Sequence, residues 1–78
     1  LEQETKTQLL HYCRLLKEPY REIAILYFYD ELGFEEIARK TGKNIKTVQT
    51  QVYRSKAMLK KFYQKEGYGH GKKAATTG

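Results

Sequence analysis

Side chains that can read the edges of nucleic-acid bases recur at helical spacing in the second half of the sequence. Residues at positions i, i+3, i+4 and i+7 of an α-helix lie on one face, and here that face would hold Thr50, Tyr53, Arg54 and Ala57. Arg can donate a forked pair of hydrogen bonds to a guanine edge, and Thr offers a hydroxyl or a methyl group. The pattern predicts a surface that reads a DNA groove. The alternative is an ordinary solvated helix face.

Further polar residues adjoin this face and extend the predicted contact. Gln49, which can pair with adenine, precedes Tyr53 by one turn, and Lys46 and Lys61 prolong the face towards its two ends. Lysine is suited to phosphate groups. The residues that we expect to bind DNA are Lys43, Asn44, Lys46, Thr47, Gln49, Thr50, Tyr53, Arg54 and Lys56.

The elements that must position these residues are predicted to be two helices joined by a tight turn. The first helix places on one face, at i, i+3, i+4 and i+7, the residues Phe34, Ile37, Ala38 and Thr41. Gly42 stands where a left-handed C-cap belongs, and Asn44 is a good N-cap for the second helix. That helix runs to about Lys65 and buries Ile45, Val48, Val52, Ser55 and Leu59. This order is typical of a helix-turn-helix, whose second helix enters the major groove.

The charge distribution agrees with nucleic-acid binding. The chain has 78 residues and a net charge of +6. Residues 1–38 hold four Lys/Arg and eight Asp/Glu, whereas residues 39–78 hold eleven Lys/Arg and one acid, Glu66. A basic half that begins at the predicted motif is the electrostatic footprint of a nucleic-acid binder. Lys72 and Lys73 by themselves would fit a basic tail that aids solubility.

Two more helices are predicted before the motif. Residues 2–17 form the first, with Leu9, Cys13 and Leu16 on its apolar stripe. Pro19 fits the first position of a second helix that continues to Gly33, the N-cap of the next. The apolar run 23–29 inside this second helix would also fit a buried strand by periodicity, but the helix start at Pro19 favours a helix.

The apolar run also predicts a protein-binding surface. A short helix in so small a domain cannot bury every side of seven consecutive apolar residues, so we expect some to stay exposed. The residues that we expect to bind a protein partner are Ile25, Phe28 and Tyr29. Clustered exposed apolar side chains mark protein interfaces. Tighter burial in the core is the alternative.

Nothing in the sequence supports an enzyme. It has no Gly-rich phosphate loop, no Cys/His metal spacing and no Ser/His/Asp or Cys/His set, so we expect no cofactor and no metal. Cys13 is the single cysteine and lies on an apolar stripe, which predicts a core residue. A lone thiol without a signal peptide favours a reducing cytosol. The first residue is Leu1, not Met, which favours a fragment of a longer protein.

Several short motifs are shared with a known family. They are Glu-Pro-Tyr-Arg-Glu at 18–22, Phe-Glu-Glu-Ile-Ala at 34–38, then Gly42, Thr47-Val48, and Arg54 followed by Ala57 and Leu59. With them, the segment from Leu16 to Leu59 resembles region 4 of bacterial sigma-70-family factors, most like the extracytoplasmic-function (group IV) type. Gln49 and Gln51 stand where the family often has basic residues, so the promoter sequence that would be read stays open.

The resemblance implies a function and partners. It implies binding of the −35 promoter element by the second motif helix, packing against the flap of the RNA polymerase β subunit, and sequestration by an anti-sigma factor in many members. Family positions that contact DNA align with Gln49, Thr50, Tyr53 and Arg54. Phosphate contacts would fall to Lys43, Lys46 and Lys56.

The sequence therefore predicts an all-α fold. Residues 1–66 form a small four-helix domain with a helix-turn-helix of the winged-helix-like, sigma region 4 type, and the Gly-rich segment 67–78 is a flexible tail or in part a cloning remnant. The expected function is promoter recognition in the bacterial cytoplasm, with double-stranded DNA and RNA polymerase core as partners and no membrane contact. Two alternatives remain open: another helix-turn-helix regulator, such as a response-regulator output domain or a sigma-like activator, and a helical protein-interaction module. Binding of polymerase core would distinguish a sigma factor from another helix-turn-helix regulator. A steep salt dependence of DNA binding would exclude the protein-interaction module.

Overall fold

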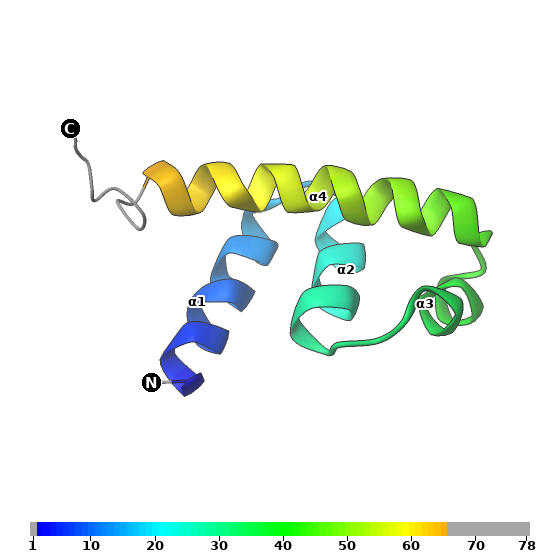
Figure 1. Cartoon of the computed structure of the whole chain (residues 1–78), viewed down its shortest axis with the longest axis horizontal. Helices are drawn as coiled ribbons and strands as arrows, with labels where there is room; N and C mark the ends of the chain where they lie inside the picture. Colours follow the sequence, from blue (N-terminus) through cyan, green and yellow to red (C-terminus); the bar gives the residue numbers. More distant parts are fainter. Residues whose placement is uncertain (1, 66–78) are drawn as a thin grey trace.

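The structure, a computed structural model, describes residues 2–65 of the chain and the side chains of residues 5–65. Its elements are α1 (Glu2–Leu15), α2 (Tyr20–Ala24), a π-helical turn η1 (Ile25–Tyr29), α3 (Phe34–Thr41) and α4 (Ile45–Lys65). The long α4 lies across the other helices, which all pack on one side of it (Figure 1). The expected all-α fold is confirmed, and the predicted tail lies outside the described residues.

The break between the first two helices is where it was predicted, with small shifts. α1 ends at Leu15, two residues before the expected end, because the Leu16 N–H donates to the Cys13 carbonyl at 3.1 Å and tightens the last turn. Pro19 occupies the N-cap position of α2 instead of its first helical position. The Arg21 side chain then donates from Nε to the Leu16 carbonyl at 3.2 Å and ties α2 to the end of α1.

The apolar run forms a helix, as expected, but the helix is not regular. After Ala24 it widens into the π-helical turn η1, in which the Asp30 N–H donates to the Ile25 carbonyl at 2.8 Å, five residues back. The wider turn spreads the apolar side chains around more of the circumference. The side chains of this turn reach two different parts of the core, Ile25 packing against one and Leu26 lying in the other.

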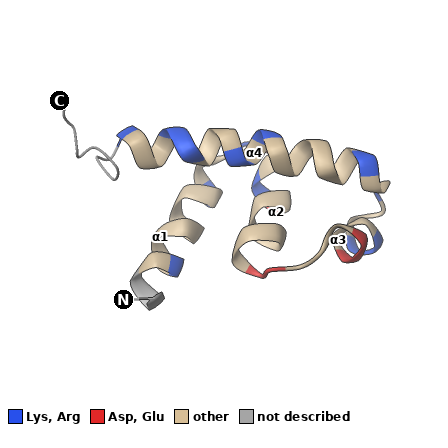
Figure 2. Cartoon of the chain, viewed as in Figure 1, with Lys and Arg blue, Asp and Glu red and all other residues tan. Residues whose placement is uncertain are grey.

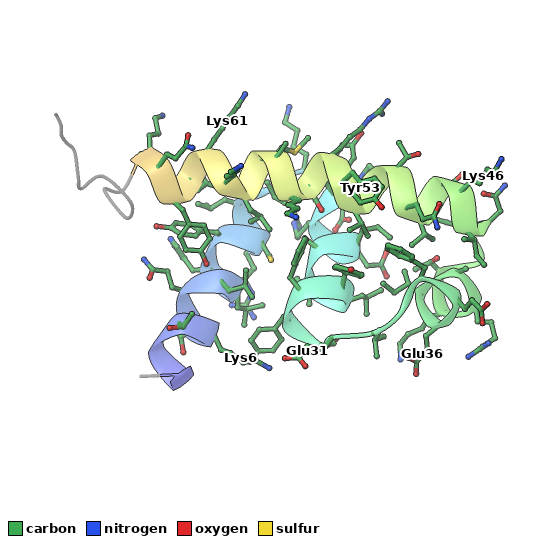
Figure 3. All side chains as sticks on the ribbon, in the orientation of Figure 1. Lys6, Glu31, Glu36, Lys46, Tyr53 and Lys61 are labelled. Atoms are coloured by element: carbon green, nitrogen blue, oxygen red, sulfur yellow. The ribbon has the colours of Figure 1, made fainter. Side chains whose placement is uncertain are left out.

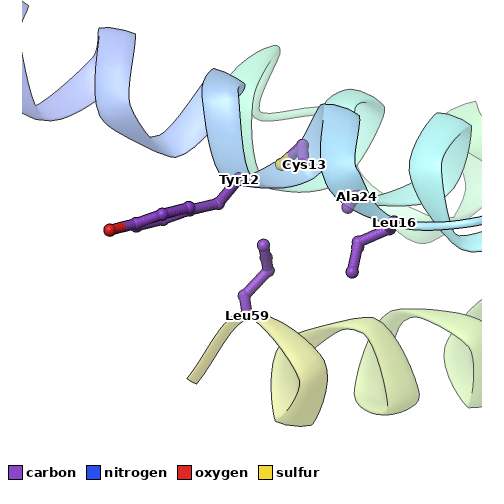
Figure 4. Close-up of a cluster of buried hydrophobic side chains, with 5 residues drawn as sticks. All are labelled: Tyr12, Cys13, Leu16, Ala24 and Leu59. Carbon is purple, nitrogen blue, oxygen red and sulfur yellow. The ribbon is translucent and has the colours of Figure 1, made fainter. Parts of the chain in front are cut away.

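The core consists of two clusters, both lying beneath α4. The first joins α1 and α2 to the C-terminal half of α4 through Tyr12, Cys13, Leu16, Ala24 and Leu59 (Figure 4). The Tyr12 ring also stacks on Phe62, with centroids 5.6 Å apart, and meets Tyr63 edge-on at 4.7 Å. The second cluster joins α2, η1 and α3 to the N-terminal half of α4 through Ile23, Leu26, Ile37, Val48 and Val52.

The turn between α3 and α4 is fixed by the predicted caps. Gly42 has a φ of 77°, the left-handed conformation that favours glycine. The Asn44 side chain accepts a hydrogen bond from the Thr47 N–H at 2.9 Å and so caps the start of α4. Thr41 Oγ1 donates to the Ile37 carbonyl at 2.7 Å. These contacts set the angle at which α4 leaves the turn.

One predicted core residue is wrong. Ile45 is 38% exposed, while Val48, Val52, Ser55 and Leu59 are buried as expected. Ile45 is the first residue of α4 and has no preceding turn of helix to pack beside it. The buried Ser55 hydroxyl donates to the Val52 carbonyl at 2.9 Å, so its polar group is satisfied inside the core.

Candidate nucleic-acid interface

The first ten residues of α4, 45–54, which we call the reading segment, present their polar side chains away from the core. Val48 and Val52 anchor the segment on α2, η1 and α3, and this fixes the rotation of the helix. The side chains of Thr50, Tyr53 and Arg54 are therefore exposed, Tyr53 by 64%. The phase predicted from the sequence is confirmed, because the face opposite the two valines is the open one.

Part of this face forms a shallow depression of about 260 Å³. It is lined by Lys46, Thr47, Thr50, Gln51 and Arg54. Cationic, hydroxyl and amide groups thus lie within one small area, and they can donate to and accept from base edges and phosphates. Gln51 was missed as a site residue. Its spacing, four residues after Thr47 and three before Arg54, is the sequence signal that could have found it.

The other predicted DNA-binding residues divide into exposed and half-buried ones. Asn44, Lys46, Thr47 and Lys56 are exposed, whereas Lys43 and Gln49 are half-buried. The Lys43 ammonium donates to Gln51 Oε1 at 3.0 Å, so these two side chains hold each other across the turn. Gln49 lies on the flank of the helix, one turn before Tyr53. The depression thus gathers four of the nine predicted residues, Lys46, Thr47, Thr50 and Arg54, together with Gln51.

The charge on α4 has a single sign. The helix carries six Lys/Arg and no Asp/Glu over its 21 residues, and the acids of the neighbouring part of the chain lie on α3 and the loop before it (Figure 2). Among the described side chains, the ion pairs are Lys6 with Glu31 and Arg21 with Glu18, neither of which involves α4. The cations of α4 are therefore not neutralised by ion pairs in this part of the chain, and they favour an anionic ligand.

Arg54 has one neighbour that no sequence pattern could have predicted. Its Nη1 donates to the Tyr20 hydroxyl at 3.5 Å, although the two residues are 34 positions apart. Tyr20 is the first residue of α2, and α2 packs under the middle of α4 (Figure 1). The contact is long and exposed, so it orients Arg54 only weakly.

The predicted partner-binding residues offer less surface than expected. Ile25, Phe28 and Tyr29 are all half-buried, and Ile25 and Phe28 pack against the core. Tyr29 is covered by Lys6, whose ammonium lies 5.1 Å from the ring centroid and donates to the Tyr29 carbonyl at 3.1 Å. The irregular η1 turn explains the difference, because it directs this run towards both clusters.

A larger apolar surface lies elsewhere, in a groove of about 780 Å³ between the end of α1, the start of α2 and the last turns of α4. Its lining contains no acidic residue and consists of Leu15, Leu16, Lys17, Tyr20, Met58, Lys61, Phe62, Gln64 and Lys65. Leu15 is 54% exposed there. Sequence reasoning missed this groove because Leu15 lies off the apolar stripe of α1 and its neighbours come from three separate elements.

Cys13 lies in the core, as predicted. It is fully buried in the cluster beneath the C-terminal half of α4, and burial raises the pKa of its thiol from 9.0 to about 11. The thiol therefore stays protonated and is a poor nucleophile at neutral pH. In the described part of the chain, no three His, Cys, Asp or Glu side chains gather as a metal site. Among residues 2–65, no helix is both long and apolar enough to cross a membrane.

Comparison with known proteins gives one family. The family model described as "Sigma-70, region 4" matches residues 6–59. The chain is also 44% identical over 41 residues to the RNA polymerase sigma factor SigV of Bacillus subtilis (strain 168). That match covers 53% of this chain and 25% of the SigV sequence, so the chain corresponds to about a quarter of this relative. No solved structure matches the chain significantly.

Proposed function

Because the chain belongs to the sigma-70 family as its region 4, a non-enzymatic DNA-binding domain of transcription initiation, we propose that it recognises the −35 promoter element and docks on RNA polymerase. The observation that supports this proposal most strongly is the open polar face of the reading segment. The face holds Thr50, Tyr53 and Arg54, and α4, the helix to which they belong, contains no Asp or Glu.

The geometry suits insertion into the major groove. A helix-turn-helix reads bases with the N-terminal turns of its second helix, and here those turns hold the exposed polar residues and the depression around Thr50. Arg54 is the residue best suited to guanine, and Gln49 and Gln51 to adenine. Lys43, Lys46 and Lys56 would contact the phosphates on either side. We expect this binding in the bacterial cytoplasm.

We place the contact with RNA polymerase in the apolar groove beside Leu15, Met58 and Phe62. The groove lies at the other end of α4 from the reading segment, so DNA and polymerase could be bound together. Its lysines, Lys17, Lys61 and Lys65, favour an apolar segment flanked by acidic residues, and the β flap is the part of polymerase that the family resemblance names. Ile25, Phe28 and Tyr29 are the competing surface for this partner or for an anti-sigma factor.

To test the proposed function, the unsubstituted chain is mixed with core polymerase and a random DNA pool, and the DNA sequences that bind are selected and read. Enrichment of one short motif in the bound DNA, lost when Arg54 is replaced by Ala, would support promoter reading by α4. Selection of a motif by the chain without any binding of core polymerase would instead favour another helix-turn-helix regulator. Absence of any enriched motif, with polymerase still bound, would favour a protein-interaction module.

A further inference from the structure

The C-terminal half of α4 carries one lysine, Lys60, to which the proposed function gives no role, and a second, Lys61, which it uses only at the edge of the apolar groove. We call residues 56–65 the groove segment, because its side chains Met58 and Phe62 line the apolar groove. Two lysines of this segment, Lys60 and Lys61, are exposed and adjacent in the sequence. Neither takes part in the two ion pairs of the described side chains.

These lysines continue the rows of the reading segment. Lys60 follows Lys46 and Tyr53 at seven-residue steps, and Lys61 follows Arg54 by seven residues. Seven residues make nearly two turns, so residues at this spacing lie almost in line along a helix. Figure 3 shows Lys61 projecting from α4 away from α1, α2 and α3, while Lys46 marks the other end of the helix.

The length of α4 gives these lysines a target. Lys46 and Lys60 are fourteen residues apart, which is about 21 Å along a helix axis. The major groove is about 12 Å wide, so a helix that enters it with its first turns must pass the bordering sugar-phosphate strand with its later turns. Homeodomains use their reading helix in this way, since its C-terminal end contacts the backbone.

We propose that Lys60 and Lys61 bind the phosphates of the DNA strand that borders the groove read by α4, so that the DNA interface runs on past the helix-turn-helix. This inference rests on the proposed function, because it needs the reading segment to be in the major groove. The two lysines supply affinity and register and carry no sequence information. The anionic phosphodiester backbone fits their exposure, their charge and their alignment with Lys46 and Arg54.

The test uses salt dependence, which counts phosphate contacts. The 78-residue chain is titrated with two DNA duplexes, one of mixed sequence and one carrying the motif selected from the random pool, at salt concentrations between about 50 and 200 mM. The double variant Lys60→Gln/Lys61→Gln is compared with Lys17→Gln/Lys65→Gln, which removes the same charge from the rim of the apolar groove. Lys60→Arg/Lys61→Arg keeps the charge and serves as the rescue, and thermal melts check that every variant is folded.

Log affinity falls as log salt rises, and each lost phosphate contact makes this slope shallower by about 0.9. We therefore expect the slope of Lys60→Gln/Lys61→Gln to be shallower than that of the parent by about 1.8. The preference for the selected over the mixed duplex should stay that of the parent. The rim control should keep the parental slope. An unchanged slope in Lys60→Gln/Lys61→Gln, or an equal loss in both glutamine variants, would overturn this inference while the parent still binds DNA. A parent that binds no duplex would overturn the proposed function itself.

Discussion

The two halves of α4 have the same charge but different surroundings. The reading segment packs on α2, η1 and α3 through Val48 and Val52, and these neighbours leave its far side open and polar. The groove segment packs on α1 through Leu59, and there α1 and α2 stop short of covering Met58 and Phe62. One continuous helix thus borders a polar surface at one end and an apolar groove at the other. The difference between the two surfaces comes from the packing partners of each half together with the side chains that the helix offers there.

The largest expected effect is unfolding of the domain, which would remove the binding surfaces of both halves of α4. Val48 is fully buried beneath the reading segment, so Val48→Asp places an unpaired carboxylate in the core and should cost more than about 4 kcal/mol of unfolding free energy. Val48→Ala, the matched control, should cost about 1–3 kcal/mol. Urea unfolding followed by circular dichroism measures both. If Val48→Asp melted like the parent, α4 would not need the α3 cluster and the two halves would be independent.

The next effect should be confined to the reading segment. Arg54→Ala removes an exposed guanidinium, and we expect a loss of about 1–3 kcal/mol of promoter-DNA affinity with weaker discrimination at one or two base pairs. Binding of RNA polymerase should be unchanged. Titration against the selected sequence and its single-base variants measures the effect. Wild-type specificity in Arg54→Ala would remove Arg54 from base reading.

A substitution in the apolar groove should weaken binding of polymerase and leave DNA binding unchanged. Leu15→Glu places a charge at the exposed edge of the apolar groove, and we expect binding of a β-flap fragment to fall about tenfold, or about 1.4 kcal/mol, with DNA affinity unchanged. Tyr29→Ser tests the competing surface in the same titration. If Tyr29→Ser weakened the flap and Leu15→Glu did not, the partner would lie on η1. Equal losses for DNA and flap would show that a variant had only destabilised the fold.

A smaller effect should depend on pH and belong to the cluster beneath the groove segment. The pKa of the Cys13 thiol is raised from 9.0 to about 11 by burial, so above about pH 9 the unfolded chain loses this proton while the folded chain keeps it. Stability is therefore lost as pH rises, by about 1 kcal/mol between pH 8 and pH 10. Cys13→Ala lacks this thiol and is otherwise identical to the parent, so it is the matched control. Parallel stability curves for parent and Cys13→Ala would contradict the prediction.

The smallest effect concerns the contact that joins the two halves. The Tyr20 ring lines the apolar groove, and its hydroxyl accepts a long hydrogen bond from Arg54. Because that bond is exposed, Tyr20→Phe should lower DNA affinity by less than about 0.5 kcal/mol and leave the melting temperature nearly unchanged. In Arg54→Ala the same change should have no effect at all. A tenfold loss in Tyr20→Phe alone would mean that Arg54 depends on Tyr20 for its orientation.

Local patterns in the sequence determined much of this protein. Helical spacing located α3 and α4 and identified Val48, Val52 and Leu59 as core, because one face of a helix must be apolar to pack. Gly42 and Asn44 marked the turn because each cap depends on only a few neighbouring residues. The same phase gave the open face of Thr50, Tyr53 and Arg54. The lack of acids between 45 and 65 was also plain in the sequence.

The tertiary structure decided what depends on distant residues. The apolar groove needs Leu15, Tyr20 and Met58 from three elements, and the contact between Arg54 and Tyr20 spans 34 positions, so neither has a periodic signal. The η1 turn shifts the hydrogen bonding of the backbone by one residue, a change that side-chain spacing does not reveal. Within this irregular turn, Tyr29, which was expected on an open surface, lies beneath Lys6. Ile45, which was expected in the core, is exposed for a separate reason, because it is the first residue of α4.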